Sequence, residues 1–62
     1  MKEIHDFEDG YKLIKTYADG DTIIEMYNEK NELRFSLQCP EEYQHEALEK
    51  SIKLADVFII ET

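Results

Sequence analysis

Apolar and polar side chains alternate without a break over residues 32–39. One set of alternate positions is apolar and the other is polar or charged, which predicts a β-strand with one face in a core and the other in water. The apolar set is Leu33, Phe35, Leu37 and Cys39. This segment is the clearest strand in the sequence.

Three further segments with strand character lie upstream, and Asp-Gly pairs separate them. Asp9-Gly10 and Asp19-Gly20 are strong hairpin signals, because a type I′ turn needs positive φ at both central residues. The third connector, residues 28–31, has no glycine, but asparagine tolerates the left-handed region and suits a longer loop. The predicted strands lie near residues 2–7, 11–17, 22–27 and 32–39.

The first of these strands is the weakest, because Ile4 and Phe7 cannot share a face under strict alternation. The sheet therefore has either three or four strands. The two middle strands carry apolar residues on both faces, which would leave apolar surface uncovered if one helix packs on one side, and such surface is typical of an interface. In the strand near 11–17, one face carries Tyr11, Leu13 and Tyr17 and the other carries Ile14. In the strand near 22–27, one face carries Ile24 and Met26 and the other carries Ile23 and Tyr27.

Pro40 favours a helix start directly after the last strand, with Glu41 and Glu42 in the first turn, where the helix dipole favours negative charge. At 100° per residue one half of the helix is apolar and the other half is charged. Val57 and Ile60 fall on the charged half, so residues 57–62 either leave the helix as an extended segment or carry apolar groups toward a partner. The inward half is Tyr43, Ala47, Leu48, Ser51, Ile52, Leu54, Ala55, Phe58 and Ile59.

The predicted fold class is α+β: an antiparallel β-meander of three or four strands, followed by one C-terminal amphipathic helix packed on one sheet face. The 62 residues predict one small domain, residues 1–62, with a marginal core. Small domains compensate with disulfides, metals or partner subunits. Cys39 is the single cysteine, so it cannot form an internal disulfide, and we expect it to be buried and structural. Self-association therefore remains as the way to compensate for the marginal core, and a dimer is the favoured state.

Charge limits the partners. The sequence has 15 acidic and 7 basic residues, a formal charge of −8. Such a charge repels nucleic acid and anionic membranes, so direct nucleic-acid binding and membrane binding are disfavoured. A protein with a basic surface remains open, and so does the alternative that the charge serves solubility alone. The N-terminal segment lacks the apolar run of a signal peptide, and we expect a cytoplasmic protein that begins at its own Met1.

No motif indicates catalysis, a cofactor or a metal. His5 and His45 have no nucleophile at a characteristic spacing and are expected to be surface residues. Asp19-Gly20-Asp21 lacks the further oxygen ligands of a calcium loop, so a hairpin turn is the preferred interpretation. We therefore expect a protein that is not an enzyme.

The preferred functional hypothesis is a small acidic inhibitor or regulator that occupies a basic surface, such as one that handles nucleic acid, on a partner protein. Small size, acidity and absence of catalytic motifs are typical of inhibitors encoded by phages and mobile elements, by analogy of type alone. The alternative is a homo-oligomeric accessory module. A meander would gather acidic loops at its two ends, and the candidate binding residues are Glu8, Asp9 and Glu29 at one end, Asp19, Asp21, Glu41 and Glu42 at the other, with Tyr17 and Tyr27 between.

Overall fold

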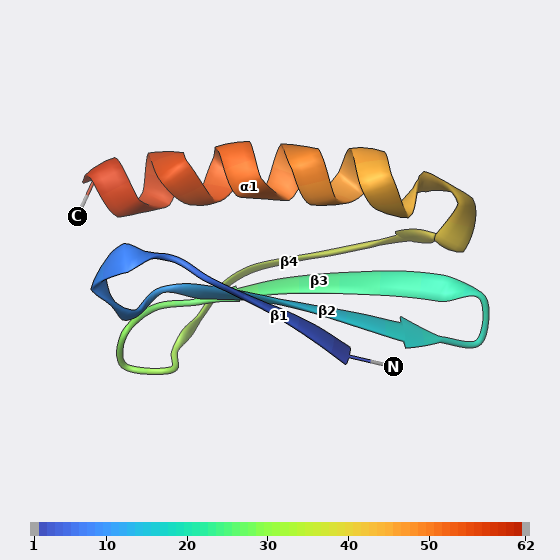
Figure 1. The fold of residues 1–62 in the computed structure, drawn as a ribbon, viewed down its shortest axis with the longest axis horizontal. Coiled ribbons are helices and arrows are strands. Elements are labelled where there is room, and N and C mark those ends of the chain that lie inside the picture. The colour runs from blue at the N-terminus through green and yellow to red at the C-terminus, as the bar shows by residue number, and fades with distance from the viewer. Residues whose placement is uncertain (1, 62) are drawn as a thin grey trace.

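The computed structural model describes residues 2–61. Four strands form one antiparallel sheet in the order β1-β2-β3-β4, and one helix, α1, crosses one face of it (Figure 1). The predicted α+β meander is confirmed, in its four-stranded form. The strands are β1 (Lys2–Asp6), β2 (Lys12–Ala18), β3 (Asp21–Tyr27) and β4 (Leu33–Pro40), and α1 spans Gln44–Glu61.

The two Asp-Gly pairs form different turns. Asp19 and Gly20, with φ of 52° and 81°, join β2 to β3 as the two-residue turn that the sequence predicts. The first connector is longer, because Asp9 lies inside a 3-10 turn, Glu8–Gly10, and the N–H of Phe7 donates to the carbonyl of Tyr11 at 2.8 Å. The two Asp-Gly pairs are therefore turn residues in loops of different length.

Asn28 organises the third connector. Its side-chain oxygen accepts hydrogen bonds from the N–H groups of Lys30 and Glu32, both at 2.9 Å. Asn31 has φ of 62°, as expected for an asparagine in the left-handed region. A bulge follows, because Tyr27 pairs with Leu33 while Met26 pairs with Phe35.

β1 forms although its alternation is poor, because its two apolar residues serve different faces. Ile4 pairs with Ile14 of β2 on the face away from the helix, while Phe7 follows the strand and packs against the core. Strict alternation within one buried face was the wrong requirement for this strand.

The helix begins later and continues further than the simplest sequence interpretation. Pro40 ends β4, Glu41–Tyr43 form a 3-10 turn, and α1 begins at Gln44. The extended alternative for residues 57–62 is wrong for 57–61, which are helical; residue 62 lies outside the described residues. Val57 and Ile60 project outward, with exposures of 48% and 82%.

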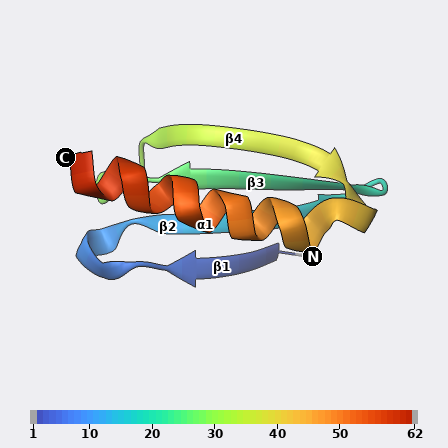
Figure 2. The same ribbon diagram turned by 90° about the horizontal axis from the view of Figure 1, so that it is seen from above.

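Small side chains bring α1 onto the sheet. Ala47, Ser51 and Ala55 are buried at intervals of four residues, which is one face of a helix. The helix runs diagonally across the sheet (Figure 2). The predicted inward half was too wide, since Tyr43 and Leu54 are 52% and 44% exposed. A narrow stripe, and not half of the circumference, faces the sheet.

The core lies under this stripe, on the two central strands. Leu13, Ile24 and Met26 are each 0% exposed. β4 is an edge strand, so its alternating residues are only partly buried, and Leu33, beyond the bulge, is 51% exposed. Cys39 is likewise partly buried, which corrects the expectation of full burial. The partly buried apolar residues around the core are Phe7, Phe35, Leu37, Cys39, Leu48, Ile52, Phe58 and Ile59.

Adjacent helix positions provide a stability test. Ala55→Asp should cost more than about 3 kcal/mol and unfold the chain, because it buries an unpaired charge where Ala55 is 0% exposed. Leu54→Asp should cost only about 1–1.5 kcal/mol, since that side chain is already in contact with water. Urea unfolding followed by circular dichroism measures both, with exposed Lys53→Glu as the control. Equal losses for Ala55→Asp and Leu54→Asp would contradict this orientation of the helix.

The two turn glycines provide a second test. Both have positive φ, so alanine should cost about 1–2 kcal/mol at either position. At Gly10 an added Cβ would also lie 2.9 Å from Cβ of Glu29, whereas at Gly20 it would meet no atom within 4 Å. Gly10→Ala should therefore lower the unfolding free energy by about 1 kcal/mol more than Gly20→Ala. A larger loss at Gly20 would show that the two loops do not touch as described.

Candidate functional site

One acidic end of the molecule combines the β2–β3 turn with the segment before the helix. The N–H of Glu41 donates to the carbonyl of Gly20 at 2.9 Å, which fixes the two segments side by side. Asp19, Glu41 and Glu42 are exposed there. Asp21 is less available, because it is half-buried and its Oδ2 accepts a hydrogen bond from Nε2 of Gln38 at 3.0 Å.

The other acidic end joins the β1–β2 and β3–β4 loops. Gly10 lies directly against Glu29, and the exposed Glu8 and Asp9 flank this contact. A shallow hollow at this end is lined by Asp9, Tyr11, Glu29 and Ile59. The two ends lie at opposite extremes of the longest dimension of the molecule, 33 Å (Figure 1). The meander thus gathers the acidic residues as the sequence predicts, and their role in binding stays a prediction.

The two candidate tyrosines lie on opposite faces, so one surface cannot present both. Tyr17 is on the helix-facing side, where its hydroxyl donates to Oε1 of Gln44. Tyr27 is on the uncovered side, where its hydroxyl donates to Oε2 of Glu25 at 3.1 Å. Burial, together with this hydrogen bond and the negative charge of Glu25, raises the pKa of Tyr27. Only Tyr27 belongs to the open sheet face.

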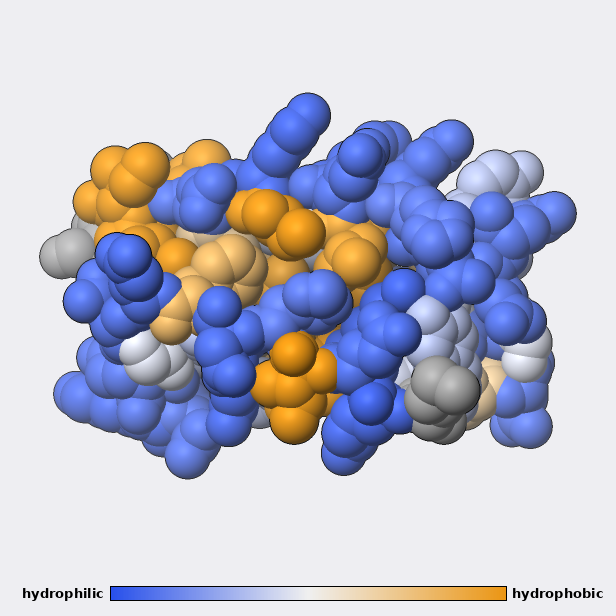
Figure 3. All heavy atoms as spheres, in the orientation of Figure 1, coloured by the Kyte–Doolittle hydropathy of each residue, from blue (hydrophilic) through white to orange (hydrophobic). Residues whose placement is uncertain are grey.

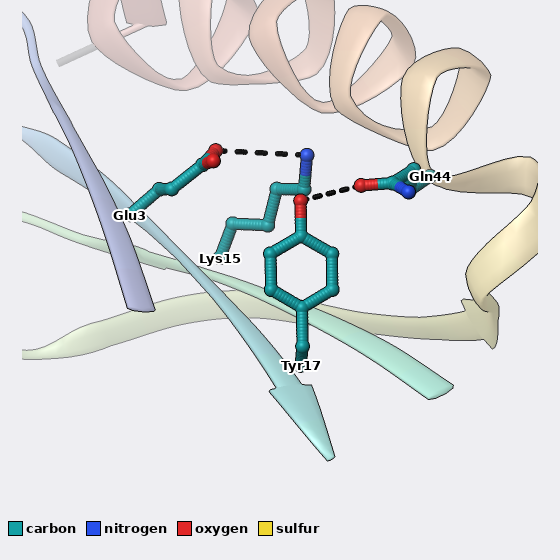
Figure 4. Close-up of polar contacts among 4 residues, drawn as sticks. All are labelled: Glu3, Lys15, Tyr17 and Gln44. Carbon is teal, nitrogen blue, oxygen red and sulfur yellow. Dashed lines mark hydrogen bonds and ion pairs between the residues drawn. The ribbon is translucent and has the colours of Figure 1, made fainter. Parts of the chain in front are cut away.

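A lysine lies in the core beneath the start of the helix (Figure 4). Lys15 is 3% exposed, its Nζ lies 3.6 Å from Oε2 of Glu3, and the same ammonium lies 5.0 Å from the centre of the Tyr17 ring. Burial lowers the pKa of Lys15, but Tyr17 and Glu3 raise it by more, so the net pKa is above its usual value of 10.5. The cluster joins β1, β2 and, through Gln44, α1.

Sequence reasoning missed this lysine, although its position carried the signal. Lys15 stands between Leu13 and Tyr17 on the same face of β2, so alternation alone places it toward the core. His5 is a related correction: it is half-buried, not a surface residue, and its Nε2 is buried without a hydrogen-bond partner among residues 2–61. Both side chains lie on the helix-facing side of the sheet, close to the edge strand β1.

The sheet face opposite α1 is open and mixed in character. Ile14, Ile23 and Tyr27 are half-buried on it, while Ile4 and Leu33 are 57% and 51% exposed. Seen from the β1 side, apolar groups lie along the helix and in a separate patch at the lower edge, with polar side chains between them (Figure 3). The sheet face opposite α1 is the apolar surface that the two-sided middle strands predict.

Within residues 2–61, no three His, Cys, Asp or Glu side chains come together as a metal would require. No helix in the same range is long and apolar enough to cross a membrane. The chain matches no protein-family model, and no curated protein or solved structure matches it. Function must therefore be argued from the surfaces themselves.

The raised pKa of Lys15 predicts an alkaline loss of stability. Because the folded-state pKa exceeds 10.5, folding favours the protonated amine; the stabilisation is complete below that pH and is lost as pH rises through the folded-state pKa. The unfolding free energy should thus fall more steeply as pH rises above 10.5 than in Lys15→Met, which keeps the packing but cannot titrate. Urea titrations across this range measure the difference. Parallel curves for the two proteins would contradict this prediction.

Proposed function

We propose that the protein is a small binding protein, an inhibitor or regulator, whose acidic surface occupies a basic surface of a partner protein. The observation that carries this proposal is the end at which the Glu41–Gly20 hydrogen bond holds Asp19, Glu41 and Glu42 together in water. Because the backbone that carries these carboxylates is fixed, binding basic side chains orders less of the chain than binding from mobile loops would.

A partner surface that normally holds nucleic acid fits the chemistry best, because its lysines and arginines already accept phosphate. The net charge of −8 would speed the encounter with such a surface and disfavour acidic partners. The residues proposed for contact are the exposed carboxylates of the two ends, with Tyr27 as the available aromatic group. Such an interaction weakens as salt rises.

The second candidate function is a homo-oligomeric accessory module. It is favoured by the large apolar groups that the single helix leaves in water, above all Ile4 on the edge strand β1. This candidate needs no foreign partner, and the charge then serves to keep the chain dissolved.

Matched charge variants test the first proposal. A partner is captured from the source cell, purified, and titrated by calorimetry at about 50 and about 300 mM salt. The triple variant Asp19→Asn, Glu41→Gln, Glu42→Gln should weaken binding by about tenfold or more at low salt. Asparagine suits the positive φ of 52° at residue 19, so the turn should persist.

The control removes the same charge elsewhere, with Glu46→Gln, Glu49→Gln and Asp56→Asn on the exposed side of α1. It should change the affinity by less than about threefold. Equal losses in both variants would show that bulk charge, and not this end, attracts the partner. Affinity unchanged in both and across the salt series would overturn the electrostatic proposal.

A further inference from the structure

β1 is an open sheet edge whose backbone faces solvent. The N–H of Phe7 points to β2, where it donates to Tyr11, and successive residues of a strand point in alternate directions. Asp6, Ile4 and Lys2 therefore direct their N–H and C=O groups away from β2. No described strand lies beyond β1, so these backbone groups form a template for one more strand.

The other edge is interrupted by two features that β1 lacks. β4 contains the bulge opposite Met26 and Tyr27 and ends at Pro40, two features that hinder strand addition. β1 has neither of them. It carries polar and charged residues on either side of one apolar residue, in the order Lys2, Glu3, Ile4, His5, Asp6.

This order is complementary to itself when the strand is reversed. In an antiparallel pair centred on Ile4, each Lys2 lies opposite an Asp6 of the second copy, and each Glu3 lies opposite a His5. The two Ile4 side chains, each 57% exposed in the single chain, meet at the centre. Every residue of the strand thus gains a favourable partner.

Neighbouring registers lack this property. A shift by two residues places Glu3 opposite Glu3, and the opposite shift places His5 opposite His5. A shift by one residue would bring the helix-covered face of one sheet to the open face of the other. The charges therefore select one register as well as permit pairing.

His5 supplies a second observation. Its buried Nε2 has no partner among residues 2–61, and Glu3, on the same face, is 45% exposed and uses one carboxylate oxygen toward Lys15. Because Lys2, Ile4 and Asp6 carry the outward backbone groups, Glu3 and His5 would form the closer, non-hydrogen-bonded pairs across the new edge. The carboxylate of Glu3 in one copy would then lie opposite the half-buried imidazole of His5 in the other.

The geometry points to a homodimer in which two β1 strands pair antiparallel about a two-fold axis at Ile4. The result is one eight-stranded sheet with both helices on the same face. This inference rests on the second function proposed above, self-association, and specifies its surface and register. It does not require the basic partner.

Complementary charge variants of the untagged chain test the interface. Lys2 and Asp6 are both exposed, so their substitution should leave the fold intact. Lys2→Asp places like charges opposite each other at both ends of the strand pair, and Asp6→Lys does the same with the opposite sign. An equimolar mixture of the two variants restores attraction at both ends, and so does the double variant Lys2→Asp/Asp6→Lys.

Sedimentation equilibrium over a wide concentration range provides the readout. The parent chain, the mixture and the double variant should approach twice the monomer mass of 7.4 kDa, while each single variant should require at least tenfold more protein to associate. Asp6→Lys lowers the net negative charge, so weaker association in that variant would oppose the trend expected from bulk repulsion.

Three outcomes would overturn the inference: a parent chain that stays monomeric throughout, dimers of equal strength in all variants, or a mixture that does not associate. The residues changed separate this inference from the basic-partner proposal. Lys2 and Asp6 lie outside the proposed partner-binding carboxylates, so their variants test dimerisation, whereas the Asp19, Glu41 and Glu42 variants test the basic partner. Either proposal can therefore fail while the other stands.

Discussion

The contact of α1 with the two central strands determines what the rest of the molecule can do. Ala47, Ser51 and Ala55 lack long side chains, so the helix lies close to the sheet along a narrow stripe. Close packing there excludes water completely from Leu13 and Ile24, but one narrow helix cannot cover four strands. Burial is therefore concentrated at the centre, and both sheet edges and one whole sheet face stay in contact with solvent.

Much of this fold follows from local sequence rules, because turns and amphipathic patterns depend on neighbouring residues. Asp19-Gly20 predicts its hairpin through backbone conformation alone. The position of α1 on the sheet is a tertiary property. The helical projection could not distinguish Leu54, which is 44% exposed, from Ala55, which is 0% exposed. A helical projection gives only the angular position of each side chain, whereas packing also depends on which side chains are small enough to let the helix approach the sheet.

The candidate sites divide in the same way. The acidic ends were predictable, since strand order in a meander fixes which loops meet. Alternation places Tyr17 and Tyr27 on opposite faces, so their shared aromatic character does not make them one recognition surface. Lys15 was overlooked because lysines are almost never fully buried unless paired, and its partner Glu3 lies on a strand that the sequence predicts only weakly.

The β1 edge and the acidic ends are connected by symmetry. A two-fold axis at Ile4 would reverse the second copy, so the end with Glu8 and Asp9 in one chain would lie beside the end with Asp19 and Glu41 in the other. The strand ends along each side of the eight-stranded sheet would then form an acidic rim, and the two rims would be identical. Repulsion within each rim opposes the dimer, which is why the strand pairing needs charges that match residue by residue. A basic partner bound along one rim would contact an acidic end of each chain, so self-association would place two electrostatic contacts on one surface without any new residue.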